Sequence, residues 1–178
     1  GCSVTTSVTI TQPPVLTLST TQINVSCNGG SNGQATATAG GGTSPYTYLW
    51  NDPAPAQSTS TSTGLTSATW TVTVTDSKGC SITASVSITQ PPAITIATTQ
   101  TNILCFGQST GQATATPSGG TSPYTYLWND PAPAQSTQTV TGLTAATWSV
   151  TVTDNKGCTS VASVTITQPA AVLSVTAT

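Results

Sequence analysis

Apolar and polar residues alternate along two well-defined stretches of the chain. In residues 69–76, TWTVTVTD, the apolar Trp70, Val72 and Val74 alternate with threonines, and in residues 81–89, SITASVSIT, apolar residues alternate with hydroxyl residues. Alternation over this length is typical of a β-strand with one buried face. We therefore predict a strand at each stretch.

Shorter candidate strands surround these two. They are VLTLS at 15–19, QATATA at 34–39, YTYLW at 46–50 and a Thr/Ser-rich stretch near 58–63. Turn sequences such as GGTSP and DSKG separate neighbouring candidates, since glycine and proline favour tight turns. Six or seven short strands in so few residues predict an all-β, immunoglobulin-like β-sandwich.

The whole pattern recurs with an offset of 78 residues. The sequence GGTSPYTYLWNDPAPAQST occurs at 41–59 and again, unchanged, at 119–137. A fixed period of this size is the signature of a tandem repeat protein. We predict two complete modules, 15–92 and 93–170.

The two ends of the sequence fit the same period. Residues 1–14, GCSVTTSVTITQPP, match residues 79–92, and residues 171–178 resemble the first strand of a module. We expect residues 1–14 to be the last strand of a preceding module and residues 171–178 the first strand of a following one. The expected architecture is a head-to-tail series of immunoglobulin-like modules.

Each module is small, so its core depends on few large apolar side chains. The residues predicted to form the core of the first module, with their equivalents 78 positions later, are Tyr48, Trp50, Leu65, Trp70, Val72, Val74, Ile82, Val86 and Ile88.

The composition excludes most catalytic chemistry. The chain holds 42 Thr and 22 Ser but no His, Glu, Arg or Met, and its formal net charge is -2. General acid–base catalysis usually needs His or paired carboxylates, and nucleic-acid binding needs clustered Arg or Lys. We expect no enzyme activity, no catalytic residue, no cofactor and no nucleic-acid partner. The absence of a long apolar run predicts no membrane insertion within these residues.

Three segments of the module carry a family resemblance. They are CNGGSNGQATATAGGGTSPYTYLW at 27–50, GLTSATWTVTVTDSKGC at 64–80 and SVSITQP at 85–91. In this order they resemble the SprB-type repeat of very large adhesins on the surface of gliding and other Bacteroidetes bacteria. The resemblance implies secretion, tandem arrays and a role in surface adhesion or motility. It implies no active site.

Two cysteines per module in a chain of this kind predict disulfides. A zinc site is not expected, because the sequence lacks both His and CxxC spacing. The simplest pairing joins the two cysteines within each module.

A second pairing follows from the expected strand order. Cys27 follows the first strand and Cys80 precedes the last, so roughly six strand residues at about 3.3 Å each separate them, well beyond the ~7 Å Cα limit of a disulfide. We therefore prefer a bond between modules, Cys27 to Cys158. Bonds within modules, Cys27 to Cys80 and Cys105 to Cys158, stay open as the alternative. We expect the partner of Cys2 to lie upstream of this sequence.

Other side chains are candidates for ligand binding or modification. Among the aromatic residues, Tyr46 and Tyr124 are the candidate glycan contacts. Asp52 and Asp76 are expected to be solvated turn residues rather than calcium ligands, which number six to eight oxygens per site. The candidate O-glycosylation sites are Thr59, Thr61, Thr63, Thr137 and Thr139.

The leading hypothesis is a non-enzymatic, secreted structural array of a cell-surface adhesin or extracellular fibre. Its modules would act as a rigid spacer, stapled by disulfides and O-glycosylated, with neighbouring modules or subunits as partners. One alternative is a glycan-binding module multiplied for avidity. Another is a fibre subunit that self-assembles by donating residues 1–14 as a strand.

Overall fold

The computed structural model describes residues 1–52, 56–130 and 134–170. These residues form two compact units. The first contains Gly1–Val25 and Gly30–Thr89, and the second contains Ser26–Gly29 together with the chain from Gln90 onward. The strand predicted at residues 171–178 lies outside the described residues.

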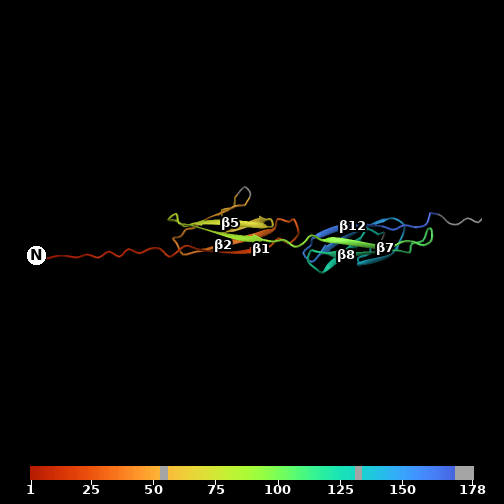
Figure 1. Cartoon of the computed structure of the whole chain (residues 1–178), viewed down its shortest axis with the longest axis horizontal. Helices are drawn as coiled ribbons and strands as arrows, with labels where there is room; N and C mark the ends of the chain where they lie inside the picture. The colour runs from red at the N-terminus through yellow and green to blue at the C-terminus, as the bar shows by residue number, and fades with distance from the viewer. Residues whose placement is uncertain (53–55, 131–133, 171–178) are drawn as a thin grey trace, which may run out of the picture. The chain divides into compact units, whose positions relative to one another are not determined.

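The described part of the first unit is built from strands alone. They form two antiparallel sheets of three strands each, in the orders β1-β2-β4 and β3-β5-β6, and β1 also lies beside β6. Figure 1 labels several of them. The strands are β1 (Thr17–Ile23), β2 (Gly33–Gly40), β3 (Thr47–Trp50), β4 (Thr61–Leu65), β5 (Ala68–Thr75) and β6 (Ser81–Ile88).

The second unit repeats this arrangement. Its sheets have the orders β10-β8-β7 and β12-β11-β9, and β7 lies beside β12. Two antiparallel sheets with this order form an immunoglobulin-like β-sandwich, which confirms the predicted fold class. The strands are β7 (Thr95–Thr101), β8 (Gly111–Ser118), β9 (Tyr124–Trp128), β10 (Thr139–Leu143), β11 (Thr147–Asp154) and β12 (Thr159–Thr165).

The alternating pattern places one face of each strand in the core. On β5, Trp70, Val72 and Val74 are buried while the threonines between them are half-buried. The core of the first unit contains Val25, Ala35, Ala37, Trp50, Leu65, Trp70, Val72, Val74, Val86 and Ile88. The core of the second unit contains Ile103, Ala113, Ala115, Trp128, Val140, Leu143, Trp148, Val150, Val152, Val164 and Ile166.

The observed core differs from the predicted one at its margins. Tyr48 and Ile82 are half-buried and pack against the core rather than within it. Ala35 and Ala37 of β2 are fully part of the core. Their small side chains alternate with threonines, so the sequence pattern did not single them out. These small side chains leave space between the two sheets for the large Trp50 side chain of β3.

The first and fourth strands also differ from their predicted positions. The strand expected at 15–19 is β1, which begins at Thr17 and continues to Ile23, and the strand expected near 58–63 is β4, which begins at Thr61. Residues 1–14 form no strand, and their side chains are exposed. A β-strand needs a paired neighbour, and no described strand pairs with this segment. The described residues include no helix long and apolar enough to cross a membrane.

Gly119 occupies a position where a side chain has no space. Its φ is +76°, and a Cβ there would lie 2.1 Å from the carbonyl oxygen of Ala93. We expect Gly119→Ala to destabilise the second unit by roughly 3 kcal/mol, from the positive φ and the clash together.

Gly142 is the matched control for this substitution. It has the same φ of +76° but no atom within 4 Å of the added Cβ. Gly142→Ala is therefore expected to cost only about 1 kcal/mol. Urea unfolding of both variants measures the difference, and equal losses would contradict the close approach at Gly119.

Candidate functional site

A hydrogen-bonded turn connects β11 to β12 in the second unit. Asp154 ends β11, and its Oδ1 accepts hydrogen bonds from the backbone N–H of Lys156 at 2.8 Å and of Cys158 at 2.9 Å. Its Oδ2 accepts a third bond, at 2.8 Å, from the backbone N–H of Thr121. A carboxylate with three backbone donors holds the turn, and hence Cys158, in one position.

The same turn occurs in the first unit. Asp76 accepts bonds from Lys78 and Cys80 at 2.9 Å each and from Thr43 at 3.0 Å. The cysteine of the GC dipeptide is therefore positioned by the same carboxylate in both units.

These hydrogen bonds shift the acidity of both carboxyl groups. Burial raises the pKa of Asp154, but the N–H donors of Cys158, Thr121 and Lys156, with the Lys156 charge, outweigh it and lower the pKa below its ordinary value. Burial also raises the pKa of Asp76, but its backbone N–H donors lower it by more. The pKa of Asp76 therefore lies below its ordinary value as well. Both groups remain ionised at neutral pH.

A lowered folded-state pKa makes stability depend on pH. The ionised Asp76 and Asp154 contribute their full stabilisation above the pKa that an aspartate has in the unfolded chain, about 4. This contribution is lost as the pH falls through the lower pKa of the folded state. We expect the urea midpoint to stay constant from pH 7 to about 5 and to fall below about pH 4. The variant carrying Asp76→Asn and Asp154→Asn should lose most of this slope. A midpoint that is equally acid-sensitive in that variant would contradict the assignment.

A glycine-rich loop lies beside the Asp154 turn. The backbone N–H of Gly120 donates to the carbonyl of Pro92 at 2.9 Å, which anchors the Pro-Pro segment that leads into β7. The hydroxyl of Tyr124 donates to the carbonyl of Gly119 within the same loop. The loop therefore holds the entry of the chain into the second unit.

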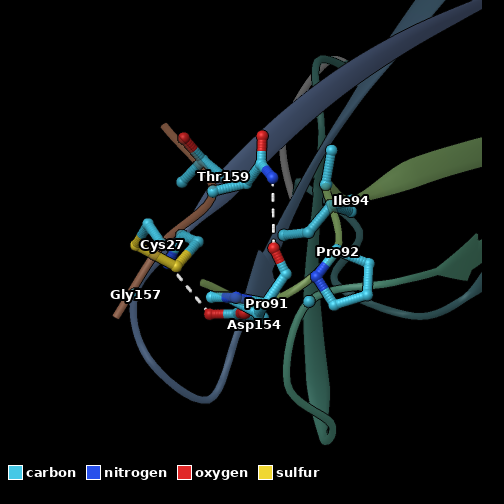
Figure 2. A pocket seen from close by; sticks show the side chains of 11 residues that line it. Cys27, Pro91, Pro92, Ile94, Asp154, Gly157 and Thr159 are labelled. Carbon is cyan, nitrogen blue, oxygen red and sulfur yellow. Dashed lines mark hydrogen bonds between the residues drawn. A yellow bond between two sulfur atoms is a disulfide. The ribbon is translucent and has the colours of Figure 1, made fainter. Parts of the chain in front are cut away.

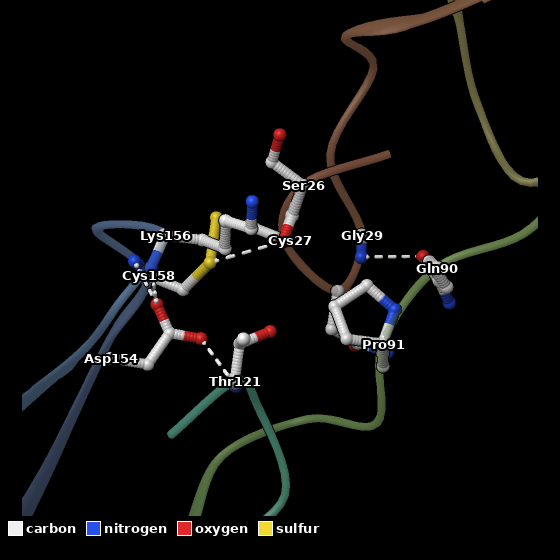
Figure 3. The surroundings of a disulfide bond; sticks show 10 residues. Ser26, Cys27, Gly29, Gln90, Pro91, Thr121, Asp154, Lys156 and Cys158 are labelled. Carbon is white, nitrogen blue, oxygen red and sulfur yellow. Dashed lines mark hydrogen bonds between the residues drawn. A yellow bond between two sulfur atoms is a disulfide. The ribbon is translucent and has the colours of Figure 1, made fainter. Parts of the chain in front are cut away.

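The segment Ser26–Gly29 completes this region of the second unit. Asn28 Nδ2 donates to the carbonyl of Pro91 at 3.1 Å, and the Gly29 N–H donates to Gln90 Oε1 at 2.7 Å, as Figure 3 shows for the latter. Although this segment comes from the first sequence repeat, it clusters with the second unit. It brings Cys27 to the Asp154 turn.

Cys27 and Cys158 form a disulfide. Their Cα atoms are 5.6 Å apart and the S–S distance is 2.04 Å. This is the pairing that the expected strand order favours over bonds within each repeat. Figure 3 shows Asp154 and its donors next to the bond.

The pairings within each repeat are absent from the structure. Cys2, Cys80 and Cys105 are free and exposed. In the second unit the Ile103 N–H donates to the carbonyl of Thr167, so Cys105 lies near the end of β12 whereas Cys158 precedes its start. The seven residues of β12 at about 3.3 Å each separate the two cysteines. Cys27 belongs to the second unit and Cys80 to the first.

A shallow cavity of about 390 Å³ opens beside the disulfide. Figure 2 shows Cys27, Pro91, Pro92, Ile94 and Asp154 around it. Its one carboxylate already accepts three backbone hydrogen bonds. Among the described residues, no group of three or more His, Cys, Asp or Glu side chains is arranged to hold a metal ion. The hydrogen bonds of this region hold backbone segments together.

The two candidate glycan contacts are tied into their loops. Tyr46 and Tyr124 are half-buried and pack against the cores. Their hydroxyl groups donate to the carbonyls of Gly41 and Gly119. Neither ring lies free on the surface as a stacking platform.

The candidate O-glycosylation sites fall into two groups. Thr59, Thr63 and Thr137 are exposed. Thr61 and Thr139 are half-buried, and their hydroxyls bond those of Thr36 and Thr114 on the neighbouring strand. In the exposed group, the Thr59 and Thr137 hydroxyls donate to the carbonyls of Thr61 and Thr139 at 2.6 Å each.

A second buried carboxylate in each unit has no signal in the strand pattern. Asp52 Oδ1 accepts from the Gln57 N–H at 3.0 Å and its Oδ2 from Gln57 Nε2 at 2.6 Å, and Gln135 bonds Asp130 in the same way. All four aspartates of the chain are buried, so the expectation that Asp52 and Asp76 are solvated is wrong. The only sequence signal is the exact recurrence of NDPAPAQST.

Solved structures show low overall similarity. They include a structure described as the basis for Dscam isoform specificity (13% identity, 76% of this chain, 41% of that chain, TM-score 0.32). A second is the amphioxus IgVJ-C2 molecule (13% identity, 88% of this chain, 98% of that chain, TM-score 0.36). A third is domains 1-6 of the surface layer protein SbsC (18% identity, 91% of this chain, 29% of that chain, TM-score 0.33). The chain spans less than half of the Dscam and SbsC structures. No curated protein matches it in sequence.

The family comparison matches part of each sequence repeat. The family model described as SprB repeat matches residues 19–55 and 97–133, two segments separated by the 78-residue period. Each matched segment begins in the first strand of a sandwich and includes its Pro-Tyr-Thr-Tyr-Leu-Trp sequence. The SprB repeat model is therefore matched once in each of the two sequence repeats.

Proposed function

We propose that this chain is a non-enzymatic structural part of a secreted cell-surface protein, in which SprB repeats form a disulfide-stapled spacer. The observation that carries the proposal is the Cys27–Cys158 bond, which joins a loop of the first repeat to the last turn of the second. Disulfides persist in extracellular surroundings. A disulfide that joins the two sequence repeats suits a mechanical role better than a catalytic one.

Surface location tests the proposal directly. Antibodies raised against residues 1–178 are expected to label intact, unpermeabilised cells that produce the protein, and external protease should remove the label. Labelling that appears only after the cells are opened would contradict the proposal.

We further propose that the modules extend over residues 15–92 and 93–170 and that residues 1–14 belong to another module. Val4, Val8 and Ile10 are almost fully exposed, whereas Val86 and Ile88, the equivalents of Val8 and Ile10, lie in the core. An exposed alternating apolar face favours pairing with the strands of a further module, in the same longer chain or by donation to a second subunit. If donation occurs, the isolated chain should self-associate, and a chain that begins at Pro14 should not.

The adhesin role and O-glycosylation belong to this proposal too. The surface carries very few charges, and glycans on the exposed Thr59, Thr63 and Thr137 would oppose edge-to-edge association. Mass measurement of the protein from its native source, before and after chemical release of O-glycans, tests this part. An unmodified mass would refute it.

A further inference from the structure

We propose that the Cys27–Cys158 disulfide makes the two repeats a nearly inextensible tether, because a pulling force passes through the bond and bypasses the strands between the two cysteines. This inference rests on the proposed structural role and adds a specific mechanical property to it. It follows from where the two cysteines lie along the chain.

The bond closes a very large covalent loop. The two cysteines are 131 positions apart, and strands β2 to β11 all lie between them. Of the strands in residues 1–170 that the structure describes, β1, before Cys27, and β12, after Cys158, are the two outside the loop. Tension applied to the two ends of the chain therefore runs through β1, the disulfide and β12.

Unfolding the two strands on this path hardly increases the distance between their ends. A β-strand already rises about 3.3 Å per residue, and a fully extended chain spans at most about 3.3–3.6 Å per residue. Unfolding β1 or β12 therefore lengthens the path by only a few ångströms. Unfolding the antiparallel hairpins of both sandwiches would release much more chain length, but these hairpins lie inside the loop.

The contrast with a reduced chain is large. Without the bond, 131 positions at about 3.5 Å each add a contour length of about 450 Å before the folded length is subtracted. With the bond, the available extension is limited to the residues outside the loop, of which those in β1 and β12 are extended already.

The period of the repeat strengthens this property in a longer series. The separation of 131 exceeds the repeat period of 78, so equivalent bonds in successive repeats would overlap. Cys80 and Cys105, which are free and exposed here, stand at the positions that such bonds would use. With overlapping loops, every complete sandwich would lie inside at least one disulfide-closed loop and would carry no tension.

Single-molecule pulling tests the inference. The chain would carry handles beyond residues 1 and 178 and the substitutions Cys2→Ser, Cys80→Ser and Cys105→Ser, so that only Cys27 and Cys158 can pair. Under oxidising conditions we expect no unfolding step that adds more than on the order of 100 Å of contour length. Addition of a thiol reductant to the same molecules should release steps that total about 450 Å.

A matched variant provides the second arm. Adding Cys27→Ser to this background should give the long steps without any reductant. If that variant fails to fold, reduction of an already folded oxidised molecule gives the same comparison. Long steps in molecules whose Cys27–Cys158 bond has been verified by mass would overturn the inference. Surface labelling of cells is independent of this result, so the inference can fail while the proposed function stands, and the reverse.

Discussion

Replacing Cys27 or Cys158 by serine is expected to lower the free energy of unfolding by about 5 kcal/mol, the loop-closure value for a bond that spans 131 positions. The bond limits the unfolded chain far more than the folded one, in which both cysteines are already held by the Asp154 turn and the Asn28 contacts. Each unit has a small core, so this is a large share of the total stability. Urea unfolding followed by tryptophan fluorescence measures the loss.

Cys80→Ser is the matched control. Cys80 follows an Asp-Ser-Lys-Gly turn that corresponds to the Asp-Asn-Lys-Gly turn before Cys158, but Cys80 is free and exposed. Its replacement is expected to change stability by less than about 0.5 kcal/mol. An equal loss in the Cys80→Ser and Cys158→Ser variants would show that the bond at Cys158 is not the source of the stabilisation.

Trp128→Ala is expected to cost about 3–5 kcal/mol and to unfold the second unit. The Trp128 side chain is 1% exposed and lies at the centre of the sandwich against β11. Its Nε1 donates to the carbonyl of Thr137 at 3.0 Å, so the substitution leaves both a cavity and an unpaired carbonyl. Circular dichroism and urea unfolding report the loss.

The neighbouring Leu127 separates packing from local chain effects. It lies on the same strand but is 57% exposed, because successive side chains of a strand point to opposite faces. Leu127→Ala should change stability by less than about 0.5 kcal/mol. If Leu127→Ala destabilises the unit as much as Trp128→Ala, the assignment of the inner face of β9 is wrong.

The fold was accessible from the sequence because its physical cause is local. Alternation on β5 and β6 marks strands with one buried face, and the unbroken 78-residue period shows that the pattern is used twice. The preferred cysteine pairing needed one further step, the order of the strands. That order places the cysteines of one repeat at opposite ends of the sandwich.

The burial of the carboxylates was not accessible in this way. Asp154 is held by Thr121, 33 positions earlier, through a backbone N–H that has no signature in residue type. Asp130 is held by Gln135 across a loop whose sequence alone suggests exposure. Charged residues in turns are usually solvated, so only the three-dimensional path of the loops shows that these four aspartates are buried.

The non-reduced tryptic map tests the central claim most directly. The only lysines are Lys78 and Lys156 and there is no arginine, so trypsin yields the peptides 1–78, 79–156 and 157–178. In the Cys2→Ser variant, the Cys27–Cys158 bond predicts that peptide 1–78 is linked to peptide 157–178 in the oxidised monomer and that peptide 79–156 is released alone. Linkage of peptide 1–78 to 79–156, or of 79–156 to 157–178, in that variant would contradict the account.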